Sequence, residues 1–196
     1  QADTAPKVPV ALPGAGHVAY PAGVKAIPPV VGQCMGCHGP NGISQIPEWP
    51  NIAGQKKDYL LAQLKAFKSG TRVDDLGMMP PVLATLSDQD MQQAVDYFSA
   101  QPRAAWTAPK DVSKSVADTA ATCQACHNNT TSTGPFPAPI LDGQKQPYLH
   151  TQLTAFRDGT RKNAEMSPVA AGLTDVQITQ IVAYLSQQPT SAAKTN

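Results

Sequence analysis

Apolar residues recur at helical spacing in two separate stretches of the chain, 55–69 and 144–158. In the first stretch these positions are Tyr59, Leu60, Leu64 and Phe67. Such spacing places one side of a helix against a core, and the glycine that follows each stretch is a stop signal. The pattern therefore predicts a helix over 55–69 and an equivalent helix over 144–158.

A second pair of helices is expected over 87–100 and 174–187. Ser87 and Thr174 are the candidate N-cap residues, because a hydroxyl oxygen accepts a hydrogen bond from the open first turn of a helix. Acidic residues follow each of them, which suits the positive end of the helix dipole.

A third pair of helices leads into two closely spaced pairs of cysteines. It is clear over 113–126 in the second half, and shorter in the first half, where Pro28 and Pro29 begin it. No stretch alternates apolar and polar residues as a half-buried strand does. We therefore predict an all-α fold with three helices in each half.

The two halves are copies of one unit. Cys34 and Cys123 stand 89 positions apart, and many residues match at that offset. The matching pairs are Pro50 and Pro139, Gly54-Gln55 and Gly143-Gln144, Tyr59-Leu60 and Tyr148-Leu149, Gln63-Leu64 and Gln152-Leu153, Phe67 and Phe156, and Gly70-Thr71-Arg72 and Gly159-Thr160-Arg161. Beyond Arg72 the offset is 87, so the second copy lacks two residues between Arg161 and Met166. A long period present twice indicates a duplicated domain rather than a solenoid.

These patterns divide the chain into four parts. We place the first domain at 29–100 and the second at 113–190, with a linker over 101–112. Residues 1–28 lie outside the repeat and are rich in proline and glycine. We expect them to form an extended N-terminal arm that packs on the body of the protein.

Charge and hydropathy narrow the classes of partner. The chain has 15 Lys and Arg against 14 Asp and Glu, a net charge of +1. No broad basic face is implied, so a nucleic-acid partner is not expected. No apolar run is long enough to predict a transmembrane helix. Because no signal-peptide pattern is present, we expect Gln1 to begin a mature, processed product.

The cysteines carry the chemistry. The sequence contains Cys-x-x-Cys-His twice, as Cys34, Cys37 and His38 and as Cys123, Cys126 and His127. This is the attachment signature of c-type haem: the two thiols add to the haem vinyl groups, and the adjacent imidazole ligates the iron. The alternatives are a zinc site and a redox-active dithiol. Neither explains the two histidines, so we predict two covalently bound haem c groups.

A second axial ligand must come from elsewhere in each domain. Met79 and Met166 are the candidates, because each lies seven residues before a leucine that precedes the last helix, Leu86 and Leu173. Met78 is the alternative to its neighbour Met79. Met35 and Met91 are not expected to ligate iron but to fill gaps in the core.

Methionine ligation would favour one function over others. An iron with histidine and methionine ligands is six-coordinate, low-spin and raised in potential relative to two histidines. That arrangement suits electron transfer and does not suit oxygen or peroxide chemistry, which needs an open position.

Four further residues are candidates around the haems. Pro50 and Pro139 each follow the motif histidine by 12 positions and are placed to offer it a backbone carbonyl. The alternative is simple loop rigidity. Arg72 and Arg161 recur in both copies and could pair with haem propionates. The alternative for both is a solvated surface position.

Over residues 30–188 the sequence resembles the dihaem cytochrome c4 family. The motifs that carry the resemblance are Cys34-x-x-Cys37-His38-Gly39, Pro50-x-Ile52-Ala53-Gly54-Gln55-x-x-x-Tyr59-Leu60, Gln63-Leu64-x-x-Phe67 and Leu86-Ser87-Asp88, with Gly143-Gln144, Tyr148-Leu149, Gln152-Leu153-x-x-Phe156-Arg157-x-Gly159 and Leu173-Thr174-Asp175. The resemblance implies two tandem class I cytochrome c domains related by a pseudo-twofold axis. It also implies His38/Met79 and His127/Met166 ligation, and supports the carbonyl roles of Pro50 and Pro139.

The same resemblance implies a periplasmic electron carrier, in some members associated peripherally with the membrane. Its expected partners are a cytochrome bc1-type donor or a dehydrogenase on one side and a terminal oxidase or reductase on the other. The alternative is a haem subunit that accepts electrons within a sulfide or thiosulfate dehydrogenase complex. An enzyme is not expected, because attachment uses all four cysteines and each domain has its own methionine.

Overall fold

The computed structural model describes residues 26–128 and 137–186. The described part is helical, without strands, as the sequence predicts. The expected N-terminal arm falls almost entirely on residues 1–25 and so lies outside the described residues, as do the last residues of the proposed second domain.

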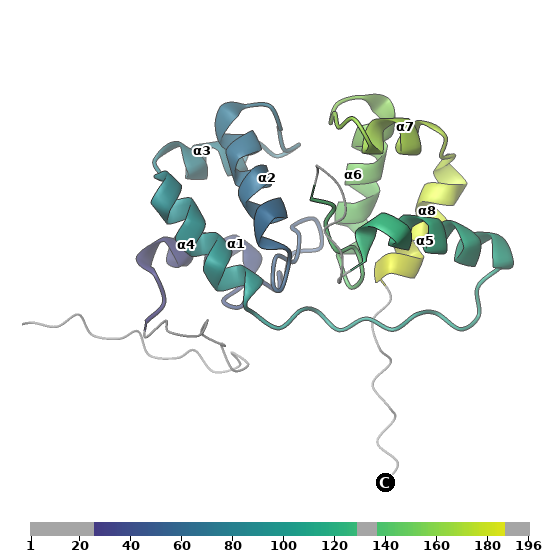
Figure 1. Ribbon diagram of the computed structural model, residues 1–196, viewed down its shortest axis with the longest axis horizontal. Helices are drawn as coiled ribbons and strands as arrows, with labels where there is room; N and C mark the ends of the chain where they lie inside the picture. The colour runs from purple at the N-terminus through teal and green to yellow at the C-terminus, as the bar shows by residue number, and fades with distance from the viewer. Residues whose placement is uncertain (1–25, 129–136, 187–196) are drawn as a thin grey trace, which may run out of the picture.

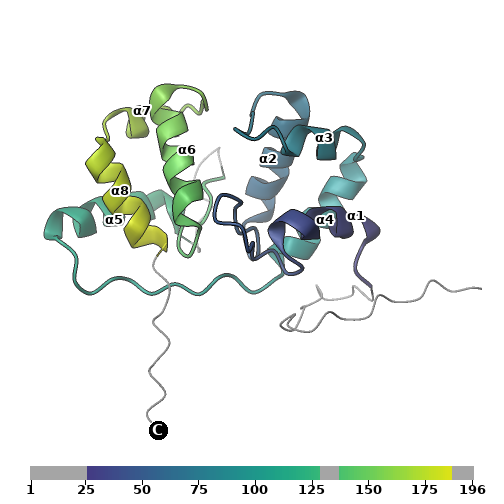
Figure 2. The same cartoon turned by 180° about the vertical axis from the view of Figure 1, so that it is seen from behind.

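In the residues that the structure describes, each domain contains four helices. The first domain holds α1 (Pro29–His38), α2 (Lys57–Ser69), α3 (Met79–Ala84) and α4 (Asp88–Ser99), and the second holds α5 (Lys114–His127), α6 (Gln146–Asp158), α7 (Met166–Ala171) and α8 (Asp175–Ser186). The two domains lie side by side, with α2 and α6 on the sides that face each other (Figures 1 and 2). The extended linker between α4 and α5 runs along one edge of both domains.

The prediction of three helices per domain is wrong, because each domain has an additional short helix, α3 in the first and α7 in the second. Each has six residues and begins at a methionine that the sequence marks as a candidate ligand. Six residues are too few to show helical periodicity. In α3 the consecutive prolines also suggest a loop, although proline suits the first turn of a helix, where its missing N–H is not needed.

The last helix of each domain begins at the N-cap residue that the sequence predicts, whereas α2 and α6 begin two residues later than predicted and have no side-chain cap. Ser87 Oγ accepts a hydrogen bond from Asp90 N at 3.1 Å, while Asp90 Oδ2 accepts one from Ser87 N at 2.8 Å, a complete capping box. Thr174 and Gln177 make the same two contacts at the start of α8, at 3.2 and 2.9 Å. Both domains therefore begin their last helix with a reciprocal side-chain cap.

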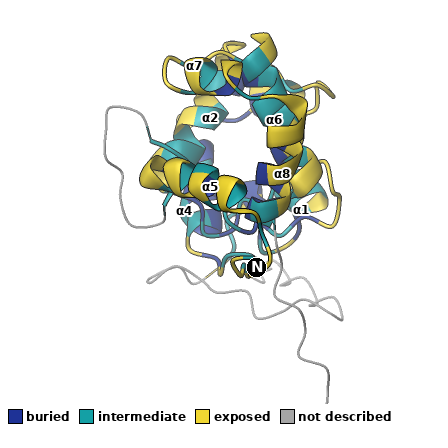
Figure 3. Ribbon diagram, turned by 90° about the vertical axis from the view of Figure 1, so that its right-hand side faces the viewer, coloured by how far each residue is buried: buried dark blue, intermediate teal, exposed yellow. Residues whose placement is uncertain are grey.

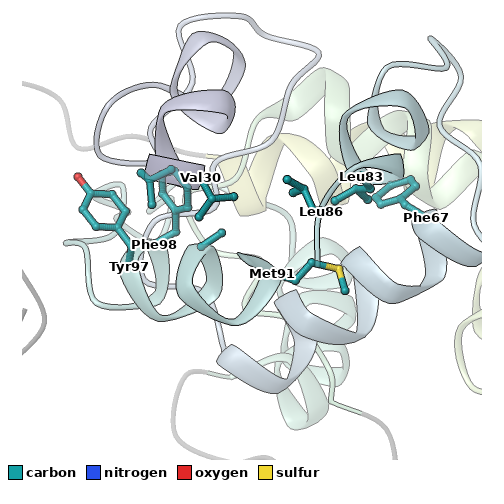
Figure 4. Close-up of a cluster of buried hydrophobic side chains, with 9 residues drawn as sticks. Val30, Phe67, Leu83, Leu86, Met91, Tyr97 and Phe98 are labelled. Atoms are coloured by element: carbon teal, nitrogen blue, oxygen red, sulfur yellow. The ribbon is translucent and has the colours of Figure 1, made fainter. Parts of the chain in front are cut away.

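Each domain has its own apolar core. In the first, α1 and α2 both pack on α4, and in the second, α5 and α6 both pack on α8. Figure 4 shows the first core, in which Val30 of α1 lies beside Phe98 of α4 and Phe67 of α2 lies beside Leu83 of α3. Figure 3 shows exposed positions on the outer sides of the helices and buried positions on their inner sides. The two cores are separate clusters. The domains are joined by hydrogen bonds between polar groups.

Two glutamine side chains clasp the domains together. Gln55 Oε1 accepts from Ile140 N at 2.9 Å, and its Nε2 donates to Ile140 O at 3.0 Å. Gln144 makes the equivalent pair of bonds to Asn51 N and O, both at 2.8 Å. Each contact of one domain thus has its counterpart 89 positions away in the other, as a pseudo-twofold axis requires. We call these four hydrogen bonds the glutamine clasp.

The linker is attached to the second domain. Arg103 Nη2 donates to the Asp142 carbonyl at 2.8 Å, and Trp106 Nε1 donates to the Tyr184 carbonyl at 3.0 Å while its ring packs on that of Tyr184. Within the described residues, no helix has both the length and the apolar character needed to cross a membrane.

Candidate haem-binding sites

The two attachment motifs lie at the ends of equivalent helices. Cys34 and Cys37 are in α1, Cys123 and Cys126 are in α5, and the motif histidine is the last residue of each helix. Residues three and four positions apart share a helix face, so each motif presents its thiols and imidazole together. Cys34 packs against the first core and Cys123 against the second. The fold therefore does not bring the four thiols into one shared zinc site.

Each motif histidine contacts a backbone carbonyl. His38 Nδ1 lies 2.9 Å from the oxygen of Pro50, and His127 Nδ1 lies 2.7 Å from that of Pro139. Because a carbonyl oxygen only accepts, Nδ1 carries the proton and the lone pair of Nε2 remains available for a metal. Burial lowers the pKa of both imidazoles, against the opposing effect of the carbonyls, and so favours the neutral form that binds metals.

The glutamine clasp also reaches these histidines. Asn51 directly follows Pro50, and Ile140 directly follows Pro139. The N–H groups of Asn51 and Ile140 share a peptide unit with these two carbonyls, so the opposite domain holds both units, through Gln144 and Gln55. The sequence shows the two glutamines as a matched pair but gives no sign of this role, because it depends on how the domains dock.

The two candidate methionine ligands occupy equivalent places. Met79 begins α3 and Met166 begins α7, and both side chains are half-buried. Met79 packs against the same core as Cys34, whereas the adjacent Met78 is 48% exposed. This placement favours Met79 over Met78, and ligation by Met79 and Met166 stays a prediction.

The sequence analysis missed the residues that support the start of each methionine helix. Asp74 accepts hydrogen bonds from the backbone N–H groups of Met78 and Met79, at 2.9 and 2.8 Å. Asn163, the counterpart of Asp74, accepts one from Met166 N at 2.9 Å. A short acidic or amide residue a few positions before a helix is a recognisable cap signal. Because the six residues of these helices show no periodicity, the sequence indicates no helix for this signal to cap.

Comparison with known proteins agrees with this geometry. A family model described as cytochrome c matches residues 29–101 and 114–189. The cytochrome c-552 of Acidithiobacillus ferridurans is 36% identical over 172 residues, 80% of this chain and 74% of the relative. Cytochrome c4 of Azotobacter vinelandii is 33% identical over 173 residues, 78% of this chain and 82% of the relative. The chain belongs to the dihaem cytochrome c4 family.

Further comparisons concern structure and function. The cytochrome c4 structure of Acidithiobacillus ferrooxidans is 34% identical, with a TM-score of 0.66, and the match covers 79% of this chain and 98% of that one. A protein of Thiomonas intermedia named thiosulfate dehydrogenase electron acceptor is 28% identical over 201 residues, 94% of this chain and 92% of the relative. The chain has two cytochrome c domains with one Cys-x-x-Cys-His motif in each. As in other cytochrome c4 proteins, it therefore carries two covalently bound haem c groups, one per domain.

Two arginines of this cytochrome c4 chain meet between the domains. Arg72 is only 8% exposed, so the alternative that it is a solvated surface residue is wrong. Its guanidinium donates to Gln63 in its own domain and to Gln152 in the other, and Arg161 donates to the same two oxygens. We call these four residues the arginine–glutamine ring. Burial of Arg72 has a physical cause that the sequence did not show: its hydrogen-bond partners come from both domains.

The ring fits the propionates of haem c. In the described part of the chain, neither Arg72 nor Arg161 forms an ion pair with a carboxylate. The Arg72 Nε atom is buried and has no acceptor among the described residues. Buried cations need an anion or a full set of acceptors, and a haem brings two carboxylates. Pairing of Arg72 and Arg161 with propionates stays a prediction that this donor set supports.

Proposed function

We propose that this dihaem electron-transfer protein is a periplasmic shuttle that passes single electrons from a respiratory donor to a terminal oxidase or reductase. The supporting observation is that each domain has its own complete pair of candidate ligands. In each, a histidine with a fixed Nδ1 proton ends one helix and a half-buried methionine begins another. A filled coordination sphere needs little rearrangement when iron changes oxidation state.

The proposed assignment gives each haem four residues. Cys34 and Cys37 attach the first haem, and His38 and Met79 ligate it. In the second domain Cys123 and Cys126 attach the haem, and His127 and Met166 ligate it. The proposed domains are 29–100 and 113–190, joined by the linker 101–112.

In this mechanism the haem supplies the one-electron couple, and the chain fixes its surroundings. The Pro50 and Pro139 carbonyls orient the imidazoles, while Asp74 and Asn163 hold the starts of the methionine helices. Rigid ligands keep the reorganisation energy low. The glutamine clasp keeps the two domains in one relation, so that an electron accepted in one can pass to the other.

The shuttle role is tested with the reduced holoprotein and bacterial membranes that contain a terminal oxidase. We expect oxidation of two electron equivalents per chain, which stops when the oxidase is inhibited with cyanide. A membrane preparation that also contains cytochrome bc1 and quinol should reduce the protein again. Oxidation no faster with membranes than in buffer would remove support for an oxidase partner.

A second candidate function is electron acceptor of a thiosulfate dehydrogenase. It is favoured by the Thiomonas intermedia relative of that name, with which the match covers nearly the whole of both chains. A purified thiosulfate dehydrogenase with thiosulfate should then reduce the holoprotein faster than it reduces a mitochondrial-type cytochrome c. Stable co-purification of the two proteins would indicate a subunit, and isolation of the free protein would indicate a shuttle.

Periplasmic location and the absence of a catalytic reaction of its own belong to the same proposal. The relevant support is the family, whose members named cytochrome c4 are similar over most of both chains. Any contact with the membrane is proposed to be peripheral.

A further inference from the structure

We propose that the arginine–glutamine ring is a shared part of both haem sites, in which each arginine raises the reduction potential of both haems rather than that of its own domain alone. The inference rests on the proposed haem assignment, and adds to it an electrostatic link between the two haems that electron transfer by itself does not require. It is based on the positions of the four side chains of the ring and on the positive charge of the two guanidiniums.

The ring is closed by four hydrogen bonds. Gln63 Oε1 accepts from Arg72 Nη1 at 2.7 Å and from Arg161 Nη2 at 2.9 Å. Gln152 Oε1 accepts from Arg161 Nη1 at 2.6 Å and from Arg72 Nη2 at 3.0 Å. Each arginine therefore contacts one glutamine of its own domain and one of the other, and neither guanidinium belongs to a single domain.

Aromatic side chains surround the ring with the same symmetry. The guanidinium carbon of Arg72 lies 4.4 Å above the ring centre of Phe67, and that of Arg161 lies 4.4 Å above the ring centre of Phe156. These contacts hold each guanidinium by cation–π attraction on its own domain, while the glutamines hold it from both sides. The positions of the two charges are fixed at the boundary between the domains.

The net charge of this cluster is positive. The acceptors that the ring uses are neutral amide oxygens, and Tyr148 adds a neutral phenol oxygen 3.0 Å from Arg72 Nη2. Burial by itself raises the pKa of the Tyr59 phenol, but Arg161 and Arg72 outweigh it, and the pKa is lowered. The lowered pKa of Tyr59 follows from the two positive charges beside it, and no carboxylate of the described residues forms an ion pair with either guanidinium.

The positive charge of the ring has a definite effect on haem iron. Reduction adds one negative charge to a haem, and a nearby cation stabilises the reduced state relative to the oxidised state. Salt and water screen this interaction less than they screen one between exposed charges, because Arg72 is buried and Arg161 half-buried. Because both guanidiniums lie at the boundary, removal of either one lowers the potential of both haems.

The test uses single substitutions of the two arginines in the holoprotein. Arg72→Gln and Arg161→Gln each remove one positive charge while leaving an amide that can still make hydrogen bonds. We expect each variant to shift both haem potentials downward in a spectroelectrochemical titration, and the double variant to shift both further. Arg157→Gln removes the same charge from an ion pair on the surface of α6 and should shift neither potential comparably.

Two additional measurements separate charge from structure. Arg72→Lys keeps the charge but lacks the planar fork of the guanidinium, so its potentials should stay closer to those of the wild type than those of Arg72→Gln. Small-angle scattering identifies any variant whose domains separate. If the domains separate in Arg72→Gln, the same comparison of the two haem potentials is made with Arg161→Gln, because Arg161 is only half-buried. A shift confined to the haem of the substituted domain, or equal shifts for Arg72→Lys and Arg72→Gln, would overturn the proposal. If the wild-type holoprotein does not show the spectrum of methionine-ligated haem, the haem assignment is overturned instead.

Discussion

The two domains share the polar contacts that hold their motif histidines and dock the domains together, but the side chains in their cores differ. The histidine–carbonyl bonds, the glutamine clasp and the arginine–glutamine ring all have counterparts in both copies. In the core, however, Phe98 and Val31 of the first domain are replaced by Leu185 and Ala120 of the second. The first domain thus buries larger side chains. The comparison shows that the site depends on polar atoms at fixed positions, whereas the core accepts any apolar side chains that fill it.

A second difference lies beside the attachment helices. In the second domain Gln124, inside the haem motif, donates to the carboxylate of Asp142, whose backbone carbonyl binds the linker residue Arg103. The counterparts in the first domain are Met35, which packs on the core, and the buried Ala53. Only the second of these two equivalent places carries a group that titrates.

The largest expected effect comes from removing a methionine ligand. Met79→Ala should abolish about half of the weak far-red absorption that reports methionine sulfur on ferric haem, and should open that haem to carbon monoxide. Met166→Ala should do the same for the other haem, which tests whether the two domains are equivalent here. Optical spectra of the oxidised and reduced variants measure both effects.

Met78→Ala is the matched control for Met79→Ala. Its side chain is 48% exposed, so the spectrum should be unchanged. If Met78→Ala loses its share of the band and Met79→Ala retains the full intensity, the assignment of the first domain is wrong.

The difference between the cores predicts the next largest effect. Phe98→Ala should lower the free energy of unfolding by about 3–5 kcal/mol and Leu185→Ala by about 2–5 kcal/mol, because both remove fully buried side chains and leave cavities. The loss for Phe98 should be the greater of the two. Urea unfolding followed by circular dichroism measures it, and an equal or reversed order would show that the smaller second core is no less tightly packed.

The glutamine clasp predicts an intermediate effect. Gln55→Ala removes both partners of Ile140, a buried residue, whereas Gln144→Ala exposes the N–H and carbonyl of the less buried Asn51 to water. An unsatisfied buried polar group costs about 1–3 kcal/mol, so we expect Gln55→Ala to lower the free energy of unfolding more than Gln144→Ala does.

Small-angle scattering should accompany the unfolding measurements on these clasp variants. A larger radius of gyration would show that the domains separate when the clasp is broken. Equal stabilities and an unchanged radius for both variants would contradict its role in docking.

The smallest expected effect concerns pH. Burial raises the pKa of Asp142 above its ordinary value of 3.8, against the opposing effects of Gln124 and Arg103. The folded protein therefore binds this proton more tightly than the unfolded chain does, and the resulting stability is lost as pH rises through the raised pKa. Relative to Asp142→Asn, the wild type should lose free energy of unfolding as the pH rises from the ordinary value of 3.8 through the raised pKa of Asp142. Urea unfolding over that range tests this, and a constant difference between the two proteins would contradict it.

The repeat and the haem motif made most of the fold predictable from the sequence. Periodicity indicated the long helices, and Ser87 and Thr174 are the caps that their hydroxyl groups suggested. The helices α3 and α7 were not predicted, because six residues give no periodic signal. Their supporting residues Asp74 and Asn163 were missed with them.

The contacts between the domains could not be derived from the sequence. Gln63, Gln152 and Arg72 are visible there as matched residues, but a repeat gives each the same neighbours in its own copy. Their partners come from the other copy, and depend on how two separately folded units dock. Burial of Arg72 is a consequence of that docking. The sequence alone allows Arg72 either to pair with a haem propionate or to lie at the solvated surface.

The most direct test of the central claim is the optical spectrum of the wild-type holoprotein, oxidised and reduced, with and without carbon monoxide. Two haems with histidine and methionine ligands predict a far-red band with an intensity appropriate to two irons and no reaction with carbon monoxide. A band of half that intensity, or ready binding of carbon monoxide, would show that one domain lacks its methionine ligand. The description of the protein as two equivalent electron-transfer sites would then be wrong.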